Sequence, residues 1–174
     1  MPSHNPNAMN APAMNPSLHA KLKRSGFTLV ELLIAVIIIA VLTSVAMPSF
    51  LDAIRKGRRS EAFTAINAVQ QAQERFRANN QSFATSMVAA VNATPPGLGL
   101  ASTTTPSGYY TLALSNVAPS SYTITATAVS GTSQANDSEC VRLQVAVNGG
   151  NMINGSYNGG GTLNEAVGNR CWSR

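Results

Sequence analysis

The sequence has few of the residues that carry most metal and nucleophile chemistry. It contains two histidines, His4 and His19, both near its start, and two cysteines, Cys140 and Cys171. A transition-metal site needs clustered Cys and His ligands, and a hydroxyl or thiol nucleophile needs an activating base. The spacing of a phosphate-binding loop or an EF-hand is also absent, and the three glycines at 159–161 are interpreted as a turn. The sequence therefore predicts no metal, no cofactor and no enzyme activity.

Acidic residues are scarce, which gives a formal net charge of +5, but the excess of cations is unevenly placed. Lys21, Lys23 and Arg24 precede a long apolar run, and most of the other cations follow it within residues 55–77. From Asn79 onward three arginines face three acidic residues, so this part is formally neutral. A nucleic-acid partner needs a basic surface and is therefore not favoured.

The apolar run covers residues 27–47, FTLVELLIAVIIIAVLTSVAM. As a helix it would be about 30 Å long, which is the thickness of the hydrocarbon core of a bilayer. The basic residues before the run place its N-terminal side in the cytoplasm, although RKGRR at 55–59 weakens the asymmetry. No small-x-small cleavage site follows the run, so we expect the chain to be cut before it.

A helical pattern continues after Pro48. Apolar residues recur at steps of three or four and predict one apolar face on an otherwise polar helix: Phe63, Ile66, Val69, Ala72 and Phe76. The pattern fades at Asn79 and Asn80, so the sequence predicts one long helix over residues 27–78.

The second half of the chain predicts a β-sheet. Segments 109–115, 122–129 and 140–147 alternate in side-chain type and are rich in β-branched and aromatic residues. We expect loops at 84–108 and 148–161, where Pro, Gly and Asn are frequent. The predicted fold class is α+β, with the amphipathic half of the helix covering an antiparallel sheet of about four strands.

The segment GFTLVE at 26–31, directly after a basic leader and at the head of an apolar run, resembles the processing site of type IV prepilins. The resemblance continues through Pro48 and the residues SFLDAIRKGRRSEA and ends at the cysteine pair with CW at 171–172. The chain is most similar to a PilE-type minor pilin of the type IVa class. The resemblance implies the pilin fold and a helix whose first half spans the membrane.

The resemblance also implies roles for single residues. A membrane peptidase would cut between Gly26 and Phe27, and the new amine of Phe27 would be N-methylated. Glu31 would pair with the amine of a neighbouring Phe27 during assembly, which gives a reason for a carboxylate that costs about 2.5–3.5 kcal/mol inside an apolar span. The alternative is a charge that snorkels from near the helix end.

Further features follow from the same resemblance. Pro48 would kink the helix, and the segment before it can melt in some filaments, although Ala40 stands where many members have glycine. Cys140 and Cys171 would form a disulfide around loop 141–170, which is interpreted either as a partner-binding loop or as a staple for a glycine-rich tail. Trp172 is expected to pack beside it.

Several surface features stay open on the sequence alone. The basic group Arg55, Lys56, Arg58 and Arg59 could contact phosphates, but a solvated stretch that faces acidic groups such as Asp52 and Glu61 on neighbouring subunits is the favoured interpretation. Sequons at Asn92, Asn136 and Asn154 leave glycosylation open. The leader is long for this family, so translation could start at Met1, Met9 or Met14.

The predicted organisation is a removed leader (1–26), a transmembrane and filament-core helix (27–54), and the rest of the helix with a β-sheet head (55–174). The predicted function is a minor pilin that initiates or joins a type IV pilus used in adhesion, twitching motility and DNA uptake. The alternatives are the major pilin, a DNA-binding competence pilin, and a type II secretion pseudopilin. Expected partners are other pilins, the prepilin peptidase, the inner-membrane assembly platform and, before assembly, membrane lipid. The precursor is expected in the inner membrane, with its head in the periplasm, and the mature chain in an extracellular pilus.

Overall fold

The computed structural model describes residues 26–172. The chain divides between Val41 and Leu42 into two compact units, which we describe separately although one helix runs through both. The predicted leader, residues 1–26, lies outside the described residues except for Gly26.

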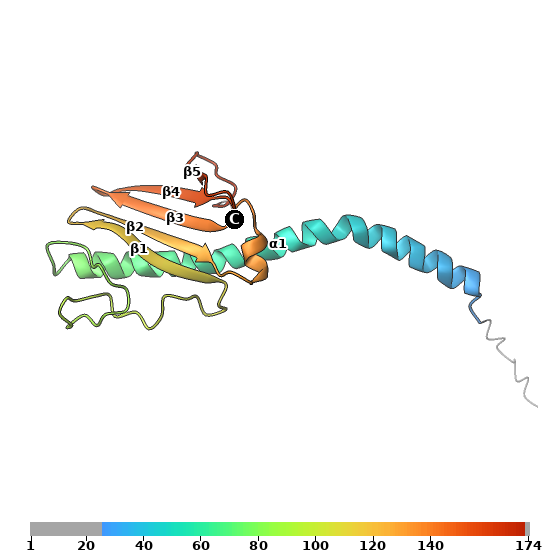
Figure 1. The fold of residues 1–174 in the computed structure, drawn as a ribbon, viewed down its shortest axis with the longest axis horizontal. Coiled ribbons are helices and arrows are strands. Elements are labelled where there is room, and N and C mark those ends of the chain that lie inside the picture. The colour runs from blue at the N-terminus through green and yellow to red at the C-terminus, as the bar shows by residue number, and fades with distance from the viewer. Residues whose placement is uncertain (1–25, 173–174) are drawn as a thin grey trace, which may run out of the picture. The chain divides into compact units, whose positions relative to one another are not determined.

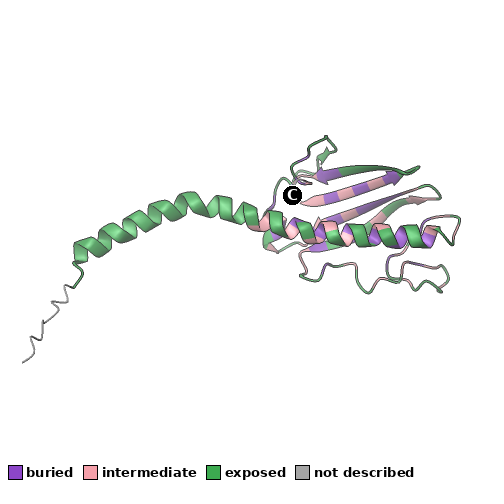
Figure 2. Cartoon of the chain, turned by 180° about the vertical axis from the view of Figure 1, so that it is seen from behind, coloured by how far each residue is buried: buried purple, intermediate pink, exposed green. Residues whose placement is uncertain are grey.

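Helix α1 runs from Leu29 to Arg77 (Figure 1) and is helical through Pro48. In the second unit one face of α1 is buried in the head, shown in purple in Figure 2. The buried residues follow the spacing of three and four that defines one side of a helix: Arg59, Ala62, Ile66, Val69, Ala72, Gln73 and Phe76. The predicted helix and its apolar face are therefore confirmed.

The head contains a five-stranded sheet in the order β1-β2-β3-β4-β5. Its strands are β1 (Tyr110–Ala118), β2 (Ser121–Ala128), β3 (Arg142–Asn148), β4 (Asn151–Tyr157) and the two-residue β5 (Leu163–Asn164). All neighbouring strands pair antiparallel, and each strand follows the previous one in sequence. The α+β prediction, with the helix packed on an antiparallel meander, is confirmed.

The prediction of a loop over 148–161 is wrong, because β4 occupies residues 151–157. The segment NMINGSY has little β propensity of its own. Gly149 and Gly150 both have positive φ and connect Asn148 to Asn151 in a two-residue hairpin, which places the segment beside β3. Pairing with a strand that is already ordered, rather than local preference, therefore forms β4.

The core lies between the buried face of α1 and one face of the sheet. Tyr110, Tyr122, Ile124 and Leu143 are fully buried and belong to the same cluster as Ile66 of the helix. The loop before β1 packs on the same core through Phe83 and Met87. Gln73 fixes the start of that loop, because its side-chain amide donates to the carbonyl of Ala84 and accepts from the Ala84 N–H, both at 2.9 Å.

Candidate functional site

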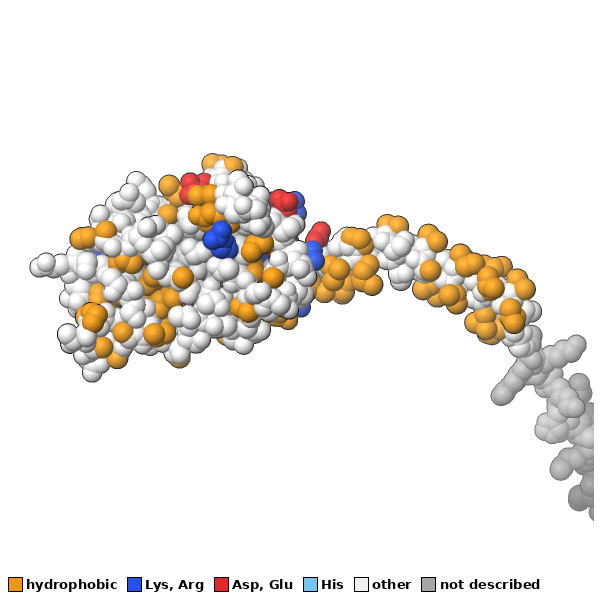
Figure 3. Space-filling view, in the orientation of Figure 1, with side chains coloured by type: hydrophobic (Ala, Val, Ile, Leu, Met, Phe, Trp, Pro, Cys, Tyr) orange, Lys and Arg blue, Asp and Glu red, His pale blue; other side chains and the backbone are white. Residues whose placement is uncertain are grey.

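The first part of α1 presents apolar side chains on every side. All described residues from 26 to 53 are exposed, including Phe27 at 80%. The helix is apolar and long enough to cross a membrane. Figure 3 shows hydrophobic side chains (orange) crowded along this segment. Exposed apolar surface of this extent is a surface that lipid or other protein covers.

The N-terminus of α1 is capped by a side chain. Thr28 precedes the first helical residue, and its hydroxyl accepts a hydrogen bond from the backbone N–H of Glu31 at 3.1 Å. This is the threonine half of a T-x-x-E capping box, a pattern that the sequence contains at 28–31 and that our sequence analysis missed. Glu31 therefore stands in the first turn, where the helix dipole favours a negative charge.

Pro48 lies inside α1 in the second unit, where a proline removes one helical hydrogen-bond donor. One residue later, Ser49 donates from its hydroxyl to the carbonyl of Ala46 at 3.0 Å. The helix does not end at this position, and the kink predicted at Pro48 stays a prediction.

Arg59 anchors the base of the head. Its Nε lies 3.2 Å from the Asp137 carboxylate, and its Nη1 lies 3.2 Å from Cys140 Sγ and donates to the Arg170 carbonyl. Arg59 and Asp137 are both buried. Helix α1 is thus tied, through one guanidinium, to the segment before β3 and to the disulfide.

The interpretation of the basic group as a solvated stretch is therefore wrong for Arg59 and incomplete for its neighbours. Arg58 lies over the ring of Tyr109 at 4.0 Å and donates to Ser133 of the 3-10 turn η1 (Ser133–Asn136). Arg55 pairs with Asp52 of the same chain at 3.1 Å. Periodicity could have found Arg59, which lies three residues before Ala62 on the buried face, but its acidic partner is distant in sequence.

Burial changes the ionisation of groups near this anchor. It raises the pKa of Asp137 above its ordinary value, and the guanidinium of Arg59 lowers it by less. Burial also raises the pKa of the Tyr110 phenol, to which Gln134 donates at 2.8 Å. At the other end of the sheet, burial raises the pKa of Tyr122 to about 12.

Cys140 and Cys171 form the disulfide that the family resemblance implied, with their Cα atoms 5.6 Å apart. Trp172 next to it stacks on Phe63 of α1, with ring centroids 4.8 Å apart, and donates to the Gly155 carbonyl at 2.8 Å. The expectation that Trp172 packs is confirmed. In the described part of the chain, no group of three or more His, Cys, Asp or Glu side chains is placed to hold a metal ion.

Comparison with known families identifies the family to which this helix and head belong. Residues 48–144, more than half of the chain, match the family described as "Type IV minor pilin ComP, DNA uptake sequence receptor". Residues 21–47 match the "Prokaryotic N-terminal methylation motif". The chain belongs to the type IV pilin family. Proteins of this family are structural subunits, not enzymes.

Curated relatives of this pilin are filament proteins by name. A fimbrial protein of Moraxella nonliquefaciens is 38% identical over 35% of this chain and 40% of its own length. The type IV major pilin protein PilA of Myxococcus xanthus is 41% identical over 31% of this chain and 24% of its own length. The type IV wide pilus major component PilA4 of Thermus thermophilus is 35% identical over 45% of this chain and 56% of its own length. The matched part thus spans between about a quarter and just over half of each relative.

Proposed function

We propose that this pilin is a structural subunit of a type IV pilus, held in the filament by the exposed apolar part of α1. The observation that carries the proposal is the contrast within one helix. Residues 26–53 are exposed throughout, whereas a face of residues 59–76 is buried in the head. A helix that leaves its most apolar part uncovered needs another protein or a membrane to cover it.

The proposed processing steps before assembly act on the segment that matches the N-terminal methylation motif. A prepilin peptidase cuts between Gly26 and Phe27, and the amine of Phe27 is then methylated. Before assembly the apolar segment lies in the inner membrane with lipid around it, the leader in the cytoplasm and the head in the periplasm. An assembly platform then transfers the subunit to a filament of pilins outside the cell.

Glu31 sets the position of each subunit in this proposal. Its carboxylate pairs with the positively charged amine of Phe27 in a neighbouring subunit. Where packed helices exclude water, such a pair is strongly favoured over either charge alone, because an unpaired charge there is costly. The Thr28 cap begins α1 so that Glu31 lies in its first turn, and the Glu31 side chain is exposed there, which leaves its carboxylate accessible to a neighbouring subunit.

The test of the assembly role is intact-mass spectrometry of filaments sheared from the native cell. The expected species starts at methylated Phe27 and is two hydrogens lighter than the reduced chain. Glu31→Gln is expected to be cut and to remain in the membrane, absent from filaments. Glu139→Gln is the matched control, because it changes an exposed acid of the head. Normal incorporation of Glu31→Gln would mean that Glu31 is a snorkelling charge.

We further propose that the subunit is a minor pilin. The match of residues 48–144 to a family described as a minor pilin supports this. The major role is the alternative, because two of the relatives are named as major components. The same spectra separate the two: a small share of the filament mass supports the minor role, and a dominant share supports the major one. A cut chain that stays in the membrane supports a pseudopilin.

A second candidate function is DNA binding, which the description of the matched family favours. Duplex DNA would be held mainly by phosphate contacts from exposed cations such as Lys56, Arg75 and Arg170. A mobility-shift assay of the full chain in detergent tests this, with binding expected to weaken as salt increases. Arg170→Gln is expected to weaken binding about equally for all sequences, and unchanged binding would count against the candidate.

A further inference from the structure

The two sulfur atoms of the disulfide lie in different electrostatic surroundings. Nη1 of Arg59 lies 3.2 Å from Cys140 Sγ, whereas Cys171 Sγ lies 3.4 Å from the carbonyl oxygen of Glu139. A guanidinium stabilises a thiolate beside it, but a carbonyl oxygen accepts a hydrogen bond from a neutral thiol. When the bond opens in this geometry, the negative charge is therefore favoured on Cys140 and the proton on Cys171.

The surroundings of the Arg59–Asp137 ion pair also favour an additional anion. The charged groups that act on Asp137 are mostly cations: Arg55, Arg59 and Arg170, against Asp52. Burial raises the pKa of Asp137, so this carboxylate holds its charge less firmly than an exposed one. A thiolate on Cys140, three residues after Asp137, can therefore compete with that carboxylate for the guanidinium of Arg59.

Both sulfur atoms are buried in the closed head, so exchange with a molecule outside needs a local opening. Cys140 is held directly before β3, since its N–H donates to the Asp137 carbonyl at 2.9 Å. Cys171 lies in residues 165–172, which follow β5, contain neither helix nor strand, and are mostly exposed. Such segments open at a lower free energy than the strands of a core. A molecule outside therefore reaches Cys171 more easily than Cys140.

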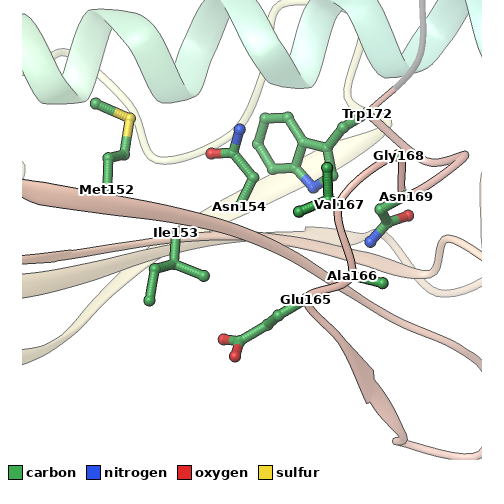
Figure 4. A pocket seen from close by; sticks show the side chains of 9 residues that line it. All are labelled: Met152, Ile153, Asn154, Glu165, Ala166, Val167, Gly168, Asn169 and Trp172. Atoms are coloured by element: carbon green, nitrogen blue, oxygen red, sulfur yellow. The ribbon is translucent and has the colours of Figure 1, made fainter.

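A cavity of about 720 Å³ beside β4 lies next to the segment that carries Cys171. Its lining includes Val167, Asn169 and Trp172, which lie on both sides of Cys171 in the sequence (Figure 4). A cavity of this volume is large enough for a small molecule. A thiol of the size of glutathione can therefore approach Cys171 through the cavity when residues 165–172 open.

We propose that Cys171 is the site at which an external thiol of low molecular mass exchanges with this disulfide, and that Arg59 makes Cys140 the leaving group. The external thiolate attacks Cys171 Sγ, a bond forms between these two sulfur atoms, and the bond to Cys140 breaks. The electron pair of the broken bond stays on Cys140 Sγ, as a thiolate beside Arg59. In the reverse direction this thiolate attacks Cys171, and the external thiol leaves as its thiolate, which closes the disulfide.

Thiol exchange and the attachment of α1 then depend on the same guanidinium. In the closed head, Arg59 of α1 pairs with Asp137 at 3.2 Å. In the open head, the thiolate of Cys140 competes for Arg59, so the ion pair that ties α1 to the segment before β3 is weaker. This inference concerns the head of a single chain and does not depend on the proposed role in a filament.

Glutathione added to the full chain in detergent tests which sulfur is attacked. Excess reduced glutathione is added at neutral pH, the exchange is stopped with acid, and the adduct is located by mass spectrometry of peptic fragments. About tenfold more adduct is expected on Cys171 than on Cys140, because the sulfur with the more stable thiolate leaves faster. Both sulfur atoms are compared in the same molecules, so the ratio does not depend on how often the head opens. Equal shares, or an excess on Cys140, would overturn the proposal.

Variants of the ion pair separate the charge of Arg59 from access to Cys171. Asp137→Asn removes the competing anion at nearly unchanged size, so the ratio of adducts on Cys171 and Cys140 is expected to rise severalfold. Arg59→Gln removes the cation, so the ratio is expected to fall toward one, whereas Arg59→Lys keeps the charge and most of the preference. Glu139→Gln is the matched control, because it changes an exposed acid beside Cys140, and it is expected to leave the ratio unchanged.

The directions of these changes decide between charge and access. Arg59 and Asp137 are partners in one ion pair, so a merely structural role would move the ratio the same way in Asp137→Asn and Arg59→Gln. If access alone selects Cys171, every folded variant keeps the wild-type ratio. Either result overturns the proposal, as does a lower ratio in Asp137→Asn. The emission of Trp172 shows which variants fold, and either folded variant of the pair is sufficient, because opposite changes are expected.

Discussion

Single buried polar residues, rather than apolar ones, fix how the parts of the head meet. Arg59 and Asp137 form an ion pair with little access to solvent. The side-chain amide of Gln73 hydrogen-bonds both the N–H and the carbonyl of Ala84, as a strand partner would. Such groups meet their partners only in one arrangement, so they make an incorrect arrangement costly. Their removal is therefore expected to cost more than the loss of an exposed polar residue of the same type.

Removal of the Asp137 carboxylate is expected to destabilise the head strongly. Asp137→Ala leaves the buried guanidinium of Arg59 without its partner, and we expect a loss of about 3–5 kcal/mol in the free energy of unfolding. Urea titration of the full chain in detergent, followed by the fluorescence of Trp172, the single tryptophan, measures the change. Glu139→Ala, at an exposed position two residues away, serves as the control. Equal stability of the two variants would show that Arg59 does not depend on Asp137.

Tyr122 is expected to make the head unstable in alkali. Burial raises its pKa in the folded chain to about 12, above the ordinary value of 10.0. The folded chain therefore keeps this proton between pH 10 and 12, where the unfolded chain loses it. Stability from Tyr122 is complete below pH 10 and falls as the pH rises toward 12. Urea midpoints at a series of pH values are expected to show this fall, and a smaller one in Tyr122→Phe; identical slopes would contradict the assignment.

At the scale of elements, α1 performs two tasks with different parts of its length. Residues 29–53 are exposed on all sides, and from Arg59 onward one face joins the core. The loop before β1 is held to the second part by the amide of Gln73 and closes the core with Phe83 and Met87. The position of this loop therefore depends on the helix.

The amide of Gln73 is expected to contribute strongly to this attachment. Gln73→Ala leaves the buried N–H and carbonyl of Ala84 without side-chain partners, so we expect a loss of about 2–3 kcal/mol in the free energy of unfolding. Gln71→Ala is a matched control on the exposed side of the same helix turn and is expected to change stability by less than about 0.5 kcal/mol. The same urea titration measures both, and similar values for both would argue against the attachment.

At the scale of the whole molecule, several contacts hold the C-terminal segment to the head. They include the disulfide between Cys140 and Cys171, the stacking of Trp172 on Phe63, and the contact of Arg59 with the Arg170 carbonyl. The segment also forms one wall of the cavity beside β4. The shape of this cavity therefore depends on how firmly the segment is held.

Loss of the disulfide is expected to destabilise the head. Cys140→Ala/Cys171→Ala is expected to lower the free energy of unfolding by about 4 kcal/mol, since the closed loop 141–170 is long. Thermal unfolding of the full chain, with and without reductant, measures the loss. The double variant is expected to be insensitive to reductant and to match the reduced wild type. A wild type that ignores reductant would mean that the disulfide does not stabilise the head.

The sequence by itself determined the features that depend on local pattern. The apolar run, the spacing of three and four residues along 63–76 and the alternation in β1, β2 and β3 all act over a few neighbouring residues. They predicted the long helix, its buried face and the antiparallel sheet. The motif at Gly26 to Glu31 also indicated the family, which the comparisons show.

The tertiary structure alone decided the features that depend on distant partners. β4 forms because a hairpin aligns a segment of weak β preference with β3. Arg59 is buried because Asp137 lies opposite it, and Trp172 is fixed because Phe63 offers a ring. No local pattern encodes these pairs, since each joins residues that are far apart in sequence. The physical reason is that a polar or aromatic side chain gains a fixed place only when folding supplies its partner.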